Sequence, residues 1–136
     1  MKAAMEKKMN AQKETFGKLF EFNAKTLHEA LEDPAPNLIL IVHIYDSIKP
    51  CMQMNNCLEQ LVRDFPHIKF CKVLATEAGV SLNFKMNALP TLQVYKGGNL
   101  IGNFVRIHDQ LGDDFYPGDV ENFLIEKDVV FSSDKS

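Results

Sequence analysis

Apolar and polar positions recur with two different periods along this chain, and the two periods predict a mixture of helices and strands. In Met5–Phe20 the apolar residues recur near helical spacing among charged ones, which predicts an amphipathic helix. Its apolar side needs a surface to cover it, on a partner or on the rest of the chain. Phe20–Phe22 alternates around Glu21 and predicts a short strand, followed by a helix over Ala24–Leu31 that Asn23 would cap.

The middle of the chain predicts a buried strand and a long helix. Leu38–Tyr45 is continuously apolar and rich in branched residues apart from His43, as expected for a strand that is covered on both faces of a sheet. Pro50–Asp64 has an apolar stripe at helical spacing, and Ile68–Leu74 predicts a third strand. Thr76–Asn87 has room for a short helix only.

The last third of the chain predicts a hairpin and a final helix. Leu92–Tyr95 and Leu100–Val105 are strands joined by Lys96–Asn99, whose paired glycines favour a tight turn between antiparallel strands. A loop over Arg106–Pro117 separates this hairpin from a helix around Val120–Leu124.

The order of the elements is therefore strand, helix, strand, helix, strand, short helix, hairpin and helix. The early crossovers are long enough for parallel pairing, and the last two strands must be antiparallel. This is the order of the thioredoxin-like fold, an α/β fold with a central mixed sheet flanked by helices, here with an N-terminal amphipathic helix. We expect an N-terminal helix over residues 1–19, a thioredoxin-like domain over 20–131 and a polar tail over 132–136.

The segment Leu89–Leu92 comes directly before a strand and resembles the cis-proline segment of thioredoxin-fold proteins. A proline lacks the N–H that a sheet needs, so it belongs at the start of a strand. We expect Pro90 to be a structural cis-proline. An ordinary trans proline at a strand entrance is the alternative.

Composition narrows the class of partner. The chain has 136 residues, 46% hydrophobic and 24% charged, which suits one globular domain, and its net charge is −3. That charge argues against nucleic acid and against an anionic membrane surface. The longest mostly apolar run, Leu38–Tyr45, is far shorter than the ~20 residues that span a bilayer, so no membrane insertion is expected. Met1–Lys13 is polar and charged, unlike a secretory signal, and predicts a cytoplasmic protein.

The three cysteines are Cys51, Cys57 and Cys71, an odd number at spacings that match neither a disulfide framework nor a zinc site. Reduced thiols are the simplest interpretation. The four histidines lie on different predicted elements, and the paired glycines are typical of a turn and not of a phosphate loop. We expect no metal and no cofactor.

Thiol chemistry is the main enzymatic alternative. In a thioredoxin the dithiol follows the central strand at the start of the next helix, where Cys51 lies, but no Cys-x-x-Cys pair is present. Cys57 is too far along the same helix to pair with Cys51. His43 occupies the strand position where thioredoxins carry a buried acid. No catalytic residue is expected, although Cys51 could still be a reactive or oxidant-sensing thiol, as in a one-cysteine thiol oxidoreductase.

Several segments together resemble the phosducin family, and the resemblance runs from about Phe16 to Val130. Five of them are His43–Tyr45, Lys69–Lys72, Ala88–Thr91, Tyr95–Gly98 and Gly102–Val105. The acidic segment Asp109–Phe115, followed by Asp119–Leu124, is similar to the branch of the family nearest to phosducin itself.

This resemblance implies a non-catalytic co-chaperone and regulator that binds the heterotrimeric G-protein βγ dimer and assists its assembly with the cytosolic chaperonin CCT. It also implies two parts, a helical region and a thioredoxin-like domain, and only Met1–Leu19 corresponds to the helical region. The chain would then be a natural short form or an excised piece, and a monomer when free. A general chaperonin client-release factor without G-protein specificity is a further alternative.

The irregular segments of the predicted fold are the first candidates for recognition, since loops on a rigid scaffold often carry it. They are the hairpin tip and the acidic loop after the last strand, where aromatic residues adjoin three aspartates. A solvated acidic loop without a partner is the alternative. The candidate partner-binding residues are Lys96, Asn99, Asp109, Asp113, Asp114, Phe115 and Tyr116.

Overall fold

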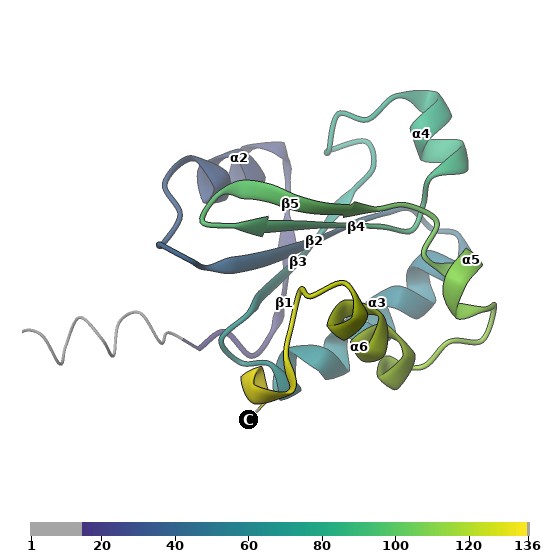
Figure 1. Cartoon of the computed structure of the whole chain (residues 1–136). Helices are drawn as coiled ribbons and strands as arrows, with labels where there is room; N and C mark the ends of the chain where they lie inside the picture. The colour runs from purple at the N-terminus through teal and green to yellow at the C-terminus, as the bar shows by residue number, and fades with distance from the viewer. Residues whose placement is uncertain (1–14, 136) are drawn as a thin grey trace, which may run out of the picture.

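The computed structural model describes residues 15–135, and within them five strands form one mixed sheet. The strands lie in the order β1-β3-β2-β4-β5 (Figure 1). β1 and β2 each pair parallel with β3, whereas β4 pairs antiparallel with β2 and β5. The strands are β1 (Leu19–Phe22), β2 (Ile39–Tyr45), β3 (Lys69–Leu74), β4 (Thr91–Lys96) and β5 (Asn99–Phe104).

Helices cover both faces of this sheet. Figure 1 shows α3 and α6 on its lower side and α2 and α4 on its upper side. The helical elements are α2 (Ala24–Glu32), α3 (Lys49–Asp64), α4 (Leu82–Asn87), α5 (His108–Leu111), α6 (Pro117–Glu126) and a short 3-10 turn, η1 (Ser132–Asp134).

The larger part of the core lies between the sheet and the pair α3 and α6. Leu58 and Leu61 of α3 and Phe123 of α6 pack with Ile41 and Phe70 of the sheet, and all five are buried. The apolar stripe that predicts α3 from the sequence is the face that this helix buries. Each such side chain contributes about 1.5–3 kcal/mol when it leaves water.

The other face is covered more thinly. Leu27 of α2 and Phe84 of α4 pack over Val42 and Val73, but neither helix contains a fully buried residue. Local caps fix where both helices start. Asn23 accepts a hydrogen bond from the Thr26 amide at 2.9 Å, and Ser81 accepts one from the Phe84 amide at 3.1 Å.

The prediction of a helix over Met5–Phe20 is wrong at its C-terminal end. Residues 15–18 are not helical, and β1 begins at Leu19. The Phe16 amide donates a hydrogen bond to the Pro66 carbonyl at 2.8 Å, which draws the chain alongside the start of β3. Tertiary pairing therefore overrides the helical pattern here. The rest of the expected helix lies outside the described residues.

Of two expectations about the second half of the chain, one is confirmed and one needs correction. The Leu89–Pro90 peptide bond is cis, as the resemblance implied. The expected loop over Arg106–Pro117 contains the short helix α5 and ends in the first residue of α6. Within residues 15–135 no helix is long and apolar enough to cross a membrane.

Candidate protein-binding surface and the thiol position

Cys51 lies in the first turn of α3, at the position where a thioredoxin would carry its dithiol. Its side chain is fully buried, and its amide donates a hydrogen bond to the Ile48 carbonyl at 3.0 Å. Burial raises the pKa of the Cys51 thiol to about 11, although a hydrogen bond with the Asp46 backbone opposes part of the shift. The thiol is therefore protonated at neutral pH and is a poor nucleophile.

Cys57 cannot pair with Cys51 in this fold. Cys57 is six residues further along α3, about 9 Å along the helix axis, whereas the two Cβ atoms of a disulfide lie about 4 Å apart. Burial raises the pKa of Cys57 to about 11 and that of Cys71 to about 12. All three cysteines are free and buried, in agreement with the expected reduced thiols.

His43 forms a buried polar pair with Asn55 of α3. Its Nδ1 lies 2.7 Å from the Asn55 Oδ1, so Nδ1 carries the proton and donates. Its Nε2 has no partner among residues 15–135. Burial lowers the pKa of His43 to about 4, and the nearby Lys72 ammonium adds to this effect, while the hydrogen bond with Asn55 opposes it. His43 is thus neutral at pH 7, and only one of its two ring nitrogens has a hydrogen-bond partner among the described residues.

The tip of the β4–β5 hairpin is well defined and exposed. Lys96 pairs with Asn99 across the turn, and both side chains reach solvent. Gly97 and Gly98 have φ values of 55° and 85°, a left-handed backbone at both central positions that suits a type I′ turn. A Cβ on Gly98 would lie 2.8 Å from Pro34 Cγ, so the turn sits tightly against the end of α2.

The acidic loop begins with an internal ion pair. The Arg106 guanidinium binds the Asp109 carboxylate with two hydrogen bonds, from Nε at 2.7 Å and from Nη2 at 3.1 Å. The bond with Arg106 lowers the pKa of Asp109. The Arg106 amide also donates to the Ala88 carbonyl at 2.9 Å, which fastens the loop beside the cis-proline segment. All three aspartates of the loop are exposed, but the Asp109 carboxylate is already paired with Arg106.

Phe115 is not the surface aromatic that the sequence predicted. Its side chain is 2% exposed and belongs to the core between α3 and α6. Its carbonyl accepts a hydrogen bond from the Gln53 side chain at 2.8 Å. Because the apolar contacts of α3 are available next to the loop, the ring turns inward. Tyr116, at 71% exposure, is the aromatic residue that this loop presents to solvent.

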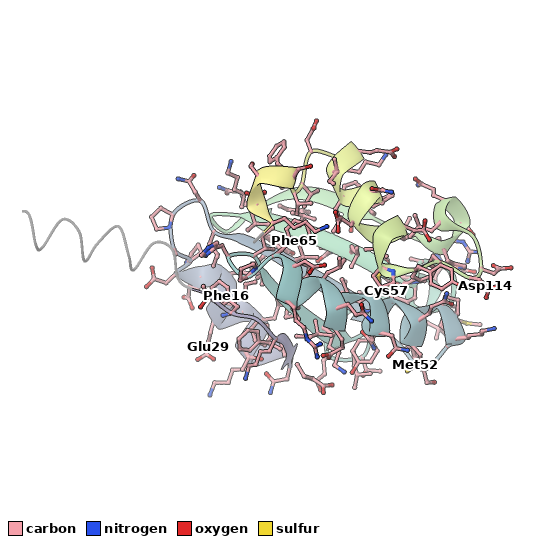
Figure 2. The ribbon with its side chains drawn as sticks, turned by 90° about the horizontal axis from the view of Figure 1, so that it is seen from below. Phe16, Glu29, Met52, Cys57, Phe65 and Asp114 are labelled. Carbon is pink, nitrogen blue, oxygen red and sulfur yellow. The ribbon has the colours of Figure 1, made fainter. Side chains whose placement is uncertain are left out.

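The structure does not gather the predicted residues into one site. The hairpin tip and α5 lie beyond opposite ends of β5 (Figure 1). Asp114 lies at the periphery of the molecule, near the half of α3 that contains Met52 and Cys57 (Figure 2). Two patches result, a tip patch of Lys96 and Asn99 and an acidic patch of Asp113, Asp114 and Tyr116.

The sequence analysis did not identify an exposed apolar pair on α4. Leu82 and Met86 of α4 are each 72% exposed, and Lys85 between them reaches the Asp46 carboxylate at 3.6 Å. Their spacing of four residues is typical of an inward helix face, so the pattern gave no sign of exposure. Only the shortness of α4 could have suggested it.

Comparison with known proteins identifies the relatives of the chain. A family model described as Phosducin matches residues 2–133. The human phosducin-like protein is 44% identical over 113 residues, 82% of this chain and 38% of that protein. Human phosducin is 40% identical over 121 residues, 85% of this chain and 49% of that protein. The Drosophila melanogaster phosducin-like protein 1 is 47% identical over 92 residues, 67% of this chain and 33% of that protein. The chain spans less than half the length of each.

Solved structures confirm the fold. The long form of spinach chloroplast thioredoxin f has a TM-score of 0.59 and 18% identity, covering 75% of this chain and 87% of that one. Thioredoxin f2 of Chlamydomonas reinhardtii also has a TM-score of 0.59, with 15% identity over 83% of this chain and 99% of that one. At these identities the similarity shows the thioredoxin-like fold alone.

Proposed function

Since the chain belongs to the phosducin family, we propose that it is a cytoplasmic protein-binding regulator of the heterotrimeric G-protein βγ dimer. In this role it binds βγ and assists the assembly of the dimer together with the chaperonin CCT. The observation that carries the proposal is the family match over residues 2–133.

The state of the thiol supports a binding role over an enzymatic one. Thiol–disulfide exchange needs an accessible thiolate, and Cys51 is buried with a pKa raised to about 11. Ile48 and Met54 occupy the positions three residues before and after it, so neither neighbour restores the Cys-x-x-Cys spacing. No observation on the described residues favours a one-cysteine oxidoreductase.

The acidic patch is the surface we assign to the βγ dimer. Asp113 and Asp114 add two negative charges beside the exposed ring of Tyr116, and aromatic residues are enriched at protein interfaces. Buried Phe115 anchors this loop to α3, so little ordering is needed when a partner binds. The tip patch, at the other end of β5, is the second candidate contact.

The first experiment measures binding of this chain to purified βγ and, separately, to purified CCT, by co-elution and calorimetry at two salt concentrations. Binding to βγ that weakens as salt rises is expected, because exposed charges are screened. Binding to CCT alone would move the function to general folding assistance, and binding to neither would refute the proposal for this chain.

Charge reversal locates the site. The variant Asp113→Lys/Asp114→Lys should weaken βγ binding about ten-fold or more while leaving the melting temperature unchanged. Asp109 is left intact, because its reversal would break the pair with Arg106. The matched control is Glu29→Lys/Glu59→Lys, which changes the net charge equally at exposed positions on α2 and α3. An equal loss of βγ affinity in both variants would show an effect of net charge alone. It would refute the assignment of βγ binding to the acidic patch.

A further inference from the structure

The end of α2 leaves a cavity on the face of the sheet that this helix covers. α2 buries none of its own residues, and it ends at Glu32, directly before Asp33 and Pro34. A cavity of about 190 Å³ lies between this end of α2, the start of β2 and the turn of the β4–β5 hairpin. Figure 1 shows α2 above this corner of the sheet. Since an engineered apolar cavity of about 150 Å³ in another protein binds benzene, the volume suits an apolar group about the size of a phenyl ring.

The walls of this cavity are aliphatic and aromatic. Leu31 and Leu40 contribute aliphatic side chains, and Phe16 and Tyr95 contribute rings. The Tyr95 hydroxyl already donates a hydrogen bond to the Gln93 side chain at 3.0 Å. An apolar group inside the cavity would therefore meet apolar surface on several sides.

One side of the cavity carries positive charge. Lys69 of β3 lines it, and among residues 15–135 the Lys69 ammonium forms no ion pair with a carboxylate. Its Nζ lies instead 5.5, 5.0 and 5.4 Å from the ring centres of Phe16, Phe20 and Phe22. The Lys18 Nζ lies 4.6 Å from the centre of the Phe20 ring and adds a second ammonium. Ring faces attract a cation but do not neutralise it, so this side of the cavity keeps its positive charge.

The opposite side of the cavity carries negative charge. Exposed Asp33 lines it there, and the next residue, Pro34, lies against the hairpin turn at Gly98. β2 separates this side from Lys69, because β3 and β4 flank β2 in the sheet. The last carbonyl groups of α2 add partial negative charge at the same side. A bound molecule would therefore meet a positive charge at one end of the cavity and a negative charge at the other.

We infer that this cavity binds a small carboxylic acid whose apolar body is about the size of a phenyl ring. The apolar body lies between Leu31 and Leu40, and the carboxylate lies at the Lys69 end. There it supplies the anionic partner that the described residues do not give to this half-buried ammonium. The reverse orientation is excluded, because it would bring the ligand carboxylate to Asp33.

This inference is independent of the proposed binding to βγ. The cavity lies at the end of the sheet where the β4–β5 hairpin turns, whereas the acidic patch follows α5, beyond the other end of β5 (Figure 1). Failure of one proposal therefore leaves the other unchanged.

The test is a titration of the full chain with phenylacetate, followed by the NMR shifts of backbone amides. Saturable shifts are expected at Leu31, Leu38 and Tyr95, with a dissociation constant in about the millimolar range, because so small a ligand makes few contacts. Phenylacetamide has nearly the same shape but no charge, and it should bind about ten-fold more weakly. Absence of saturable shifts at these residues, or equal binding of the acid and the amide, would overturn the proposal.

Two substitutions should change the affinity in opposite directions. Lys69→Met keeps most of the side-chain stem and removes the ammonium, so it should weaken phenylacetate binding about ten-fold and abolish the preference for acid over amide. Asp33→Asn removes the negative charge at the other end and should strengthen binding about two-fold. An unchanged affinity in Lys69→Met would contradict the assigned position of the carboxylate.

The matched control is Lys72→Met on the same strand. Lys72 is three residues from Lys69 on β3, so its side chain leaves the opposite face of the sheet, and its loss changes the net charge equally. Lys72→Met should bind phenylacetate as the unmodified chain does, and Lys69→Arg should restore the preference for the acid. Equal weakening by Lys69→Met and Lys72→Met would show an effect of net charge alone and would overturn the proposal. If Lys69→Met does not fold, the comparison of acid and amide on the unmodified chain decides.

Discussion

Acid should destabilise this domain through one buried side chain, His43. The imidazole lies on the central strand β2 with no exposed surface, and its one hydrogen-bond partner within residues 15–135 is Asn55 at 2.7 Å. Burial lowers the pKa of His43 from the ordinary 6.5 to about 4 in the folded state. In the unfolded chain the imidazole regains water and its ordinary pKa.

The sign and the size of the effect follow from this difference. Because the folded-state pKa is depressed, the unfolded chain binds the proton more readily, and protonation favours unfolding. The stability is therefore fully present above pH 6.5 and is lost as the pH falls from 6.5 toward 4. A difference of about 2.5 pKa units corresponds to about 3 kcal/mol, and most of it is lost by pH 4.5. Against a typical total of 5–15 kcal/mol this is a large fraction.

The assay is urea unfolding followed by circular dichroism at several pH values between 7.5 and 4.5. The unmodified chain is compared with His43→Leu, which has no titratable group at this position. The carboxylates that titrate in the same range are common to both, so the difference between the two pH profiles isolates His43. His28→Gln, at an exposed position on α2, is the control and should follow the unmodified profile.

Equal losses of stability in the unmodified chain and in His43→Leu would refute the reasoning. If the variant does not fold, the test moves to the unmodified chain. The NMR signal of the His43 ring should then stay at its neutral position down to about pH 5, since a pKa near 4 leaves it unprotonated there. A ring that titrates near pH 6.5 in the folded state would show that water reaches it.

Three further predictions concern the thiol, the acidic loop and the hairpin. Alkylation of Cys51 at pH 7.5 should be about 100-fold slower in the folded chain than in urea, because its pKa rises from 9.0 to about 11; mass spectrometry after timed quenching measures it. Phe115→Ala should cost about 3–5 kcal/mol in urea unfolding, whereas Tyr116→Ala should change stability by less than about 0.5 kcal/mol. Gly98→Ala should lower the melting temperature, since a Cβ there would meet Pro34 Cγ at 2.8 Å with φ at 85°. A reactive folded Cys51, a neutral Phe115→Ala or an unchanged Gly98→Ala would each contradict its prediction.

Most of the fold could be predicted because long, strongly periodic segments decide it. The continuous apolar run that predicts a strand over Leu38–Tyr45 is β2, buried at the centre of the sheet. The stripe over Pro50–Asp64 is α3, one residue longer at its start. The paired glycines fix the hairpin, since both adopt the left-handed conformation that a short antiparallel turn needs.

The failures have one physical cause, which is competition between local pattern and tertiary packing. Phe16 fits a helical period, but residues 15–18 are not helical and the Phe16 amide donates to the Pro66 carbonyl instead. The strand that the alternation over Phe20–Phe22 predicts is confirmed as β1. Phe115 stands in a polar, acidic segment that favours exposure, yet its ring is buried in the hydrophobic core with residues of α3. The hydrogen bond between Asn55 and His43 could not be predicted either, since only the fold brings the two side chains together.

The two features that sequence reasoning placed together, acidic charge and aromatic surface, therefore serve different purposes. Phe115 holds the end of the loop to the core, and the Arg106–Asp109 pair holds its start beside α4. Between these anchors Asp113 and Asp114 are the charged residues that lie on the surface, and exposed Tyr116 follows them. A segment fixed at both ends loses little conformational entropy on binding, so a small number of contacts can give useful affinity. The buried ring that cannot touch a partner is thus what holds the exposed part of the loop in place for the binding that we propose.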